Sequence, residues 1–481
     1  MRHRREAGWI RGLCLGGLLA LAGCASHAST MHDVRAALRH HDLEEARARL
    51  AEAGRGTDDL LFALEDGLLL YYAGDPELSN DRFEFAERRV DDLYTESITR
   101  AVLSLVSSDL VLRFEPRGIE NFLVNYYRAF NYLELGEPEE AWVEWRKLGW
   151  KLQFSREQGD ALYLDPPFFS YVAGLGLEAD DPNDAYIAFR RAEASYRERG
   201  AGAPPPELID DLIRLAHDLG FSDHLELYLT CYGERAAALD QALVSAGGRA
   251  ARADWGELVV FVEDGLVAPI EEVQVQLPIT RGRAELVASG GEGAHLDLAA
   301  ILAREYAEGR FAGIEPRYAR RRGIAYLMPI SLPVFGLGQA AFGRVAAVVG
   351  NDTAAAWPAL QVSALQQLAF QDRLLGIYAK TIARALVKYA AAAKLREEAE
   401  EEGGETAGDV VGILANLVNV ITERADTRAW LGLPHRIWMA RLRVPPGRRE
   451  VRLLFDGREA VTLGEVEVTP GDRQLLSYRV F

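Results

Sequence analysis

The stretch "FLVNYYRAFNYLELGEPEEAWVEWRKLGW" (Phe122 to Trp150) decides the fold of the first half of this chain. Apolar residues recur at spacings of three and four on both sides of Gly136-Glu137-Pro138, which is the pattern of two amphipathic helices joined by a short turn. Glycine would end the first helix, and proline fits the first turn of the second. The small side chains of Ala129 and Ala141 would let the two helices approach closely. The sequence therefore predicts a helix pair here.

This helix pair resembles a tetratricopeptide repeat (TPR). Ala129, Tyr132, Gly136 and Ala141 stand at that family's small, aromatic, turn and small positions. Weaker copies flank it, at "RHHDLEEARARLAEA", "LEDGLLLYYAGDPELSNDRFEFA" and "YVAGLGLEADDPNDAYIAFRRAEASY". The resemblance implies a TPR-like α-solenoid over residues 24–250. A generic array of helical hairpins is the alternative, and neither architecture implies catalysis.

Solenoids of this type bind partners through a concave face, which the first helix of each pair lines. In the clearest repeat the side chains at these positions are apolar: Leu123, Tyr126, Phe130 and Leu133. A continuous apolar surface is covered either by a partner or by another part of the same chain. These four residues are candidate interaction residues. We expect the second half of the chain to cover them, because it is large and directly connected.

The first thirty residues indicate the compartment. Four arginines precede a short apolar run, which is far below the roughly 20 apolar residues that a membrane-spanning helix needs. This pattern is typical of a cleaved export signal over residues 1–23. The run ends in Leu21-Ala22-Gly23-Cys24, which resembles the lipobox of bacterial lipoproteins; an ordinary signal with a chance cysteine is the alternative. The resemblance implies lipidation of Cys24, including a palmitate-type acyl chain. Because Ala25 rather than aspartate follows, it also implies the periplasmic face of the outer membrane.

Composition and charge restrict the class of protein. The chain has 481 residues, enough for two or three domains, with 49% hydrophobic and 26% charged residues, as in globular proteins. The net charge is −18, and it becomes about −21 once the four arginines and one glutamate of residues 1–23 are removed. So much negative charge argues against nucleic acid and anionic lipid surfaces as partners. Once residues 1–23, which include Cys14, are removed and Cys24 is lipidated, Cys231 has no intramolecular partner for a disulfide, and we expect it to be buried.

The pattern changes near residue 251. "ELVVFVEDG" reads as a buried strand and "VQVQLPI" alternates strictly, which predicts a β-rich domain over residues 251–357. Within it, Gly323 to Gly343 carries no charge, which indicates two short buried strands joined by a turn; a membrane-inserted segment is the alternative. Short alternating strands with Pro-Gly and Asp-Gly turns predict a small β-sandwich over residues 425–481. The predicted fold class is therefore α+β and multidomain: a TPR-like α-solenoid, then a mixed α/β region that ends in this sandwich.

Between these β-rich regions we expect a helical hairpin over residues 358–424. Its first helix runs from Pro358 to about Glu402, and its second from Asp409 to Glu423. Lys380, Arg384 and Lys388 recur every four residues along the first helix. This spacing places a basic stripe on one face, which we interpret as a solvated surface; a docking stripe for an acidic partner or a glycan phosphate is the alternative.

Three segments together resemble a family of bacterial outer-membrane lipoproteins with a TPR-like half and no settled activity: "NYYRAFNYLELGEPEEA", "GELVVFVEDGLVAPIEE" and "ADTRAWLGLP". The resemblance covers most of the mature chain and implies architecture and location, not mechanism. Within the last segment, Asp426, Arg428 and Trp430 lie between the last predicted helix and the sandwich. We expect Asp426 to cap or turn, Arg428 to bridge elements and Trp430 to pack the junction. An Arg/Trp pair that contacts a ligand is the alternative.

The sequence shows no convincing catalytic motif. The nine histidines do not cluster, and HExxH, CxxC and GxSxG are absent, so we predict no metal, cofactor or catalytic residue. The prediction is a non-enzymatic, lipid-anchored cell-envelope protein that acts as a protein-interaction scaffold for an envelope partner, such as a cell-wall synthase. The alternative is a cell-wall-active enzyme, or a regulator of cell-wall synthases, with a carboxylate-lined cleft. Converging carboxylates with raised pKa would favour the enzyme, whereas an apolar groove would favour the scaffold.

Overall fold

A computed structural model describes residues 27–54, 58–104, 114, 116, 118–159, 161–198, 200–245, 255–280, 324–403 and 424–481. The predicted signal peptide, Cys24 and the predicted helix Asp409–Glu423 lie outside these residues. Within the ranges that are described, no helix combines the length and the apolar character needed to cross a membrane.

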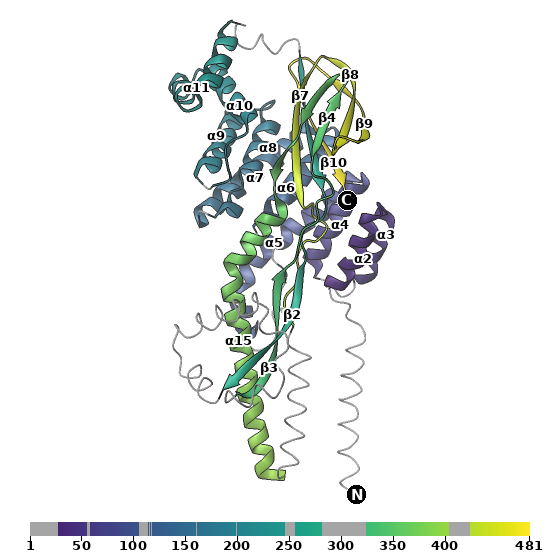
Figure 1. Cartoon of the computed structure of the whole chain (residues 1–481), viewed down its shortest axis with the longest axis vertical. Coiled ribbons are helices and arrows are strands. Elements are labelled where there is room, and N and C mark those ends of the chain that lie inside the picture. Colours follow the sequence, from purple (N-terminus) through teal and green to yellow (C-terminus); the bar gives the residue numbers. More distant parts are fainter. Residues whose placement is uncertain are drawn as a thin grey trace.

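The first half folds into helix pairs, and each helix packs mainly against its neighbours along the chain (Figure 1). The helices are α2 (His27–Arg39), α3 (Leu43–Ala53), α4 (Asp59–Ala73), α5 (Pro76–Ser104), α6 (Glu120–Leu135), α7 (Pro138–Gln158), the short 3-10 helix η2 (Leu162–Leu164), α8 (Pro167–Leu177), α9 (Pro182–Glu198), α10 (Pro206–Asp218) and α11 (Ser222–Ser245).

The helix pair predicted at Phe122 to Trp150 is confirmed as α6 and α7. Gly136 ends α6 with a φ of 74°, the left-handed conformation in which glycine commonly ends a helix. Ala129 and Ala141 are fully buried, as close helix packing requires. The expectation for Cys231 was wrong: it is exposed on α11, because that helix lies at the end of the array and buries little of its surface.

In the part of the chain that the structure describes, the strands form two four-stranded sheets and one hairpin. One sheet has the order β10-β1-β7-β6, the other has the order β5-β4-β8-β9, and β2 pairs with β3. The strands are β1 (Gly256–Asp264), β2 (Ile270–Thr280), β3 (Ile324–Phe335), β4 (Val345–Val349), β5 (Asp352–Ala355), β6 (Trp357–Leu360), β7 (Arg436–Val444), β8 (Gly447–Phe455), β9 (Glu459–Val468) and β10 (Arg473–Val480).

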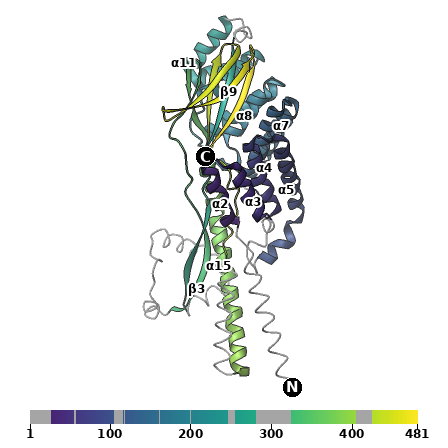
Figure 2. The same ribbon diagram turned by 90° about the vertical axis from the view of Figure 1, so that its right-hand side faces the viewer.

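The sheet that contains β1 lies between the helices and the other sheet. Successive side chains of a strand point to opposite faces. On β1, Val259 and Phe261 belong to the core shared with the helices, whereas Leu258, Val260 and Val262 belong to a second core between the sheets. Figure 2 shows α4, α5 and α7 on one side of the sheets.

The predicted boundary at residue 425 cuts through both sheets. β1 pairs with β7 and β10, β6 pairs with β7, and β4 pairs with β8. Strands from the predicted domains 251–357 and 425–481 therefore fold together. Period-two alternation reveals a strand but not its partner, because strand pairing joins residues that are far apart in the sequence.

A long helix and a long hairpin extend away from the sheets (Figures 1 and 2). The helix is α15 (Val362–Gly403). Its predicted start at Pro358 was wrong, because residues 357–360 form β6. Gly323 to Gly343 was predicted as two short strands but contains the single long strand β3. Tyr378 of α15 donates a hydrogen bond to the Pro333 carbonyl of β3 at 3.2 Å. Arg384 is only 2% exposed, so the predicted basic stripe is not a wholly solvated face.

Candidate functional site

The segment around Asp426, Arg428 and Trp430 packs into the helical half. The Arg428 guanidinium is paired with Asp426 at 2.9 Å and lies 3.7 Å from Asp58, at the start of α4. Trp430 is fully buried, and its ring contacts those of Phe83 and Tyr127. These contacts match the structural interpretation of the three residues and leave little of their surface for a ligand.

Buried polar contacts hold the same segment in place. Both carboxylate oxygens of Glu65 accept backbone N–H groups, from Leu431 at 2.7 Å and from Gly432 at 3.0 Å. Arg35 donates to the carbonyls of Leu431 and Val267 at 2.7 and 2.8 Å. Burial raises the pKa of Glu65 to about 8, against the opposing effect of the two N–H donors. The segment therefore joins the helices to the sheets.

The four predicted concave residues divide into two groups. Leu123 and Tyr126 are fully buried in the core, where the Tyr126 ring lies 6.3 Å from that of Phe261 on β1. The sheet therefore covers this part of the helical face, as we expected of the second half. Phe130 is also buried, with its ring 5.4 Å from that of Phe261, but Phe130 and Leu133 lie nearer the end of α6 and reach the wall of an open groove.

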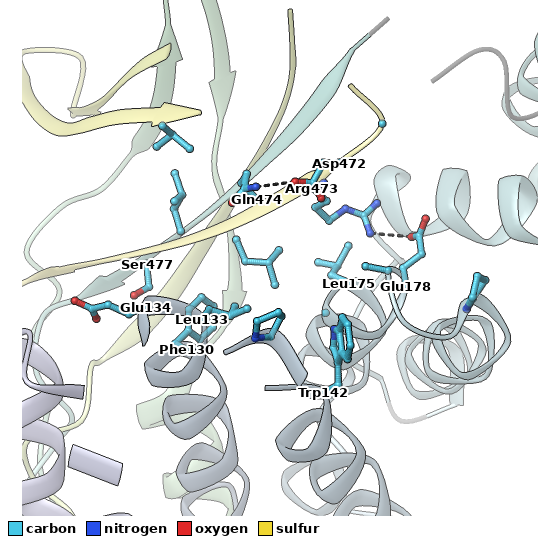
Figure 3. A pocket seen from close by; sticks show the side chains of 18 of the residues that line it. Phe130, Leu133, Glu134, Trp142, Leu175, Glu178, Asp472, Arg473, Gln474 and Ser477 are labelled. Atoms are coloured by element: carbon cyan, nitrogen blue, oxygen red, sulfur yellow. Dashed lines mark hydrogen bonds and ion pairs between the residues drawn. The ribbon is translucent and has the colours of Figure 1, made fainter. Parts of the chain in front are cut away.

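We call this groove the β10 groove. It lies between β10 and the ends of the helices, and has a volume of about 1050 Å³. Figure 3 shows Gln474 and Ser477 on the side of β10, with Phe130, Leu133 and Trp142 facing them from α6 and α7. Its apolar lining comes from helix ends and from the edges of both sheets: Phe130, Leu133, Pro138, Trp142, Leu175, Pro182, Leu215, Leu219, Leu463, Val466, Leu475 and Leu476.

A cluster of buried ion pairs, which we call the arginine cluster, contributes Glu178, Arg214 and Arg473 to the lining of the β10 groove. It consists of three arginines and three carboxylates, together with a tyrosine: Arg214, Arg441, Arg473, Glu178, Asp211, Glu257 and Tyr171. Asp211 is 2.6 Å from Arg441, and Glu257 is 2.7 Å from Arg473. A second cavity of about 460 Å³ lies beside the same cluster.

The arginines keep these carboxylates ionised. Burial by itself would raise the pKa of Glu257, but Arg441 and Arg473 outweigh it and lower the pKa to about 2. The same two arginines, with Arg214, hold the pKa of Asp211 well below its usual range despite complete burial. Because three positive and three negative groups pair with one another, the cluster joins α8 and α10 to β1, β7 and β10 and presents no surplus charge of its own.

The groove carries little that suggests acid–base chemistry. Its buried carboxylates are paired with arginines, which is the opposite of the raised pKa that a general acid requires. Glu134, at the end of α6, has a raised pKa, chiefly through partial loss of solvation and then through the charge of Glu77, but its side chain stays open to solvent. Among the described residues, no group of three histidine, cysteine or acidic side chains is arranged to hold a metal ion.

Sequence reasoning missed the arginine cluster, although a signal was present. On β7, Arg441 lies on the same face as the buried Ile437 and Met439, and on β1, Glu257 shares a face with Val259 and Phe261. A charged residue that continues an apolar face in a strand needs a buried partner. The alternation could have shown this need, but not which helix supplies Asp211.

Comparisons with known proteins give a limited likeness. No family model matches the chain, and no curated protein matches it. Among solved structures, MamA from Desulfovibrio magneticus RS-1 is 13% identical with a TM-score of 0.27, over 44% of this chain and 94% of that one. A MamA RS-1 double mutant is 14% identical with a TM-score of 0.27, over 45% and 95% of the two chains. The apo form of RapI is 14% identical with a TM-score of 0.30, over 46% and 73%.

Proposed function

We propose that this protein is a non-enzymatic, lipid-anchored lipoprotein of the bacterial outer membrane, whose TPR-like helical half serves as a protein-interaction scaffold. The site of interaction is the β10 groove, where a segment of an envelope protein binds between the helix ends and β10. The observation that carries the proposal is the lining of this groove, which is open and carries apolar side chains from several helices and from both sheets.

The lining of the β10 groove favours a binding scaffold over an enzyme. Apolar concave sites with a few polar groups are typical of binding surfaces. Trp142 is partly exposed at the wall of the β10 groove, and tryptophan is enriched among residues that dominate binding energy at protein interfaces. The arginines and carboxylates of the arginine cluster are held in mutual pairs, so they orient the two halves of the chain and leave the apolar wall to the partner.

The anchoring part of the proposal rests on Leu21-Ala22-Gly23-Cys24. Two acyl chains already suffice for stable attachment to a bilayer. We expect the Cys24→Ser variant to lose incorporation of labelled palmitate and to leave the outer-membrane fraction. A variant that still incorporates palmitate and fractionates with outer membranes would contradict the lipoprotein assignment.

The binding part is tested by site-specific photo-crosslinking in cells. A photoreactive amino acid replaces Leu476 in the β10 groove, and a matched variant carries it at Arg448, whose side chain is 79% exposed on β8 and outside the groove. We expect discrete protein adducts from position 476 that position 448 does not give. If position 476 forms no adduct with another protein, the groove is not a protein-binding site and the scaffold proposal fails.

A further inference from the structure

The outer edge of β10 runs along the β10 groove. β10 is the last strand of its sheet, with β1 as its neighbour. The consecutive residues from Arg473 to Ser477 all line the groove, although successive side chains of a strand point to opposite faces. A groove that is lined by both faces of a strand follows the edge of that strand, where its backbone groups are presented.

The hydrogen-bond register identifies which backbone groups point into the groove. Glu257 donates its N–H to the Asp472 carbonyl at 2.9 Å, and Gly265 donates to the Val480 carbonyl at 3.0 Å. In a parallel pair, alternate residues of each strand supply the groups that bond to the neighbour, so the even-numbered residues of β10 face β1. Leu475 and Ser477 therefore direct their N–H and C=O groups outward, and across the described ranges no strand pairs with that edge.

The wall opposite β10 offers apolar contacts at intervals along this edge. Phe130 and Leu133 come from α6, Trp142 from α7 and Leu175 from α8, so the contacts follow the successive helix ends (Figure 3). When an extended peptide adds to a sheet edge, its main-chain hydrogen bonds provide affinity, and pockets for alternate side chains provide specificity. An exposed edge beside an apolar wall has both features.

The charge of the groove restricts the peptide further. Four carboxylates and two guanidinium groups line it: Glu134, Glu178, Asp218, Asp472, Arg214 and Arg473. Both arginines are paired with Glu178, at 2.7 and 2.8 Å, and also with Asp211 of the arginine cluster. The other three carboxylates leave the groove acidic. Like charges placed together at an interface oppose binding, so the groove favours basic side chains.

On the basis of the function proposed above, we propose that the occupant of the β10 groove is an extended segment of a partner protein that carries basic side chains. This segment adds to the outer edge of β10 as a further strand. Its backbone pairs with Leu475 and Ser477, its apolar side chains contact Trp142 and its neighbours, and its basic side chains meet Glu134 and Asp472. A strand of about 5–6 residues is the usual length for such pairing.

The first test measures binding of designed peptides to the purified full-length protein by fluorescence anisotropy. The probe alternates valine and lysine over about six residues, a typical strand length. One control replaces each lysine with glutamate, and two others methylate the amide nitrogens of either the odd or the even residues. We expect the glutamate peptide to bind at least about tenfold more weakly, which corresponds to ~1.4 kcal/mol. Methylation in one register should abolish binding, whereas the other register should be tolerated.

The second test changes the protein. Leu475→Pro removes the outward N–H without affecting the hydrogen bonds between β10 and β1. Edge strands accept proline at a position whose N–H points away from the sheet. Leu475→Ala is the matched control, since it loses the same side chain and keeps the N–H. We expect the proline variant to bind the lysine peptide at least about tenfold more weakly than the alanine variant.

Three outcomes would overturn the inference: no binding of the lysine peptide, equal binding of the two methylated peptides, or equal binding by the two Leu475 variants. If any of these occurs while position 476 still crosslinks to a partner, strand addition is wrong and the scaffold proposal stands. If position 476 gives no adduct, the scaffold proposal itself has failed.

Discussion

Replacing Asp211 with asparagine should destabilise the protein strongly. Asp211 is 2% exposed on α10, and its carboxylate lies between three arginines: 2.6 Å from Arg441, 3.0 Å from Arg214 and 3.3 Å from Arg473. Asparagine keeps the size of the side chain but removes the charge. The three guanidinium groups would then share two carboxylates, Glu178 and Glu257, so one positive charge would remain buried without its counterion.

The expected loss in the free energy of unfolding follows from the cost of removing one partner of a buried ion pair, which is about 3–5 kcal/mol. The amide oxygen of asparagine still accepts one hydrogen bond, so we expect the lower end of this range, about 3 kcal/mol. The neighbouring Asp210 provides the control, since it also pairs with an arginine, Arg235, at 2.7 Å. There the side chains are 28% and 50% exposed, and such a pair contributes roughly 0–1 kcal/mol.

Urea denaturation followed by tryptophan fluorescence compares the native protein with Asp211→Asn and Asp210→Asn. Only the first variant should lower the midpoint substantially. The pH dependence gives a second check. A lowered folded-state pKa means that the carboxylates contribute stability above their unfolded pKa, near 4, and lose it as the pH falls toward about 2. The difference between native and Asp211→Asn should shrink over that range. Equal midpoints for the two variants at pH 7 would refute the reasoning.

Three further perturbations test other parts of the structure. In Gly176→Ala the new Cβ would lie 2.2 Å from Nε1 of Trp145, so we expect a loss of about 1–3 kcal/mol in melting experiments. In the control Gly149→Ala, the new Cβ would meet only the flexible end of an arginine side chain, at 3.6 Å, so this change should be neutral or stabilising. Equal losses of stability in the two variants would contradict the packing of α7 on α8. Ala141→Leu should cost about 1–3 kcal/mol, because Ala141 is fully buried; unchanged melting would show that the helix register is wrong. Burial raises the pKa of Glu263 to about 7, so its contribution to stability is present below pH 4.5 and lost as the pH rises through 7. Glu263→Gln should therefore become more stable than the native protein, by up to about 3 kcal/mol in the free energy of unfolding, as the pH rises from 5 to 8. A difference in unfolding free energy that does not change with pH would refute this.

The sequence predicted only part of the candidate site. Phe130 and Leu133 were identified from their helical positions, and both line the β10 groove. The same reasoning placed Leu123 and Tyr126 on that surface, but both are fully buried, and the Tyr126 ring, like that of Phe130, packs against Phe261 of β1. Helical periodicity shows which face of a helix is apolar. It does not show how far along that face a sheet from elsewhere in the chain extends.

The sequence by itself determined the local elements of this protein. The helix pair around Gly136, the buried strand β1 and the alternating strand β2 follow from periodicity and turn residues, because these signals act over a few neighbouring positions. Only the tertiary structure decided that β1 pairs with β7 and β10, that Arg441 and Arg473 meet Asp211, and that the outer edge of β10 faces the helix ends. The reason is physical: strand partners and buried counterions are chosen by packing between residues some 200 positions apart, where no local pattern records the choice.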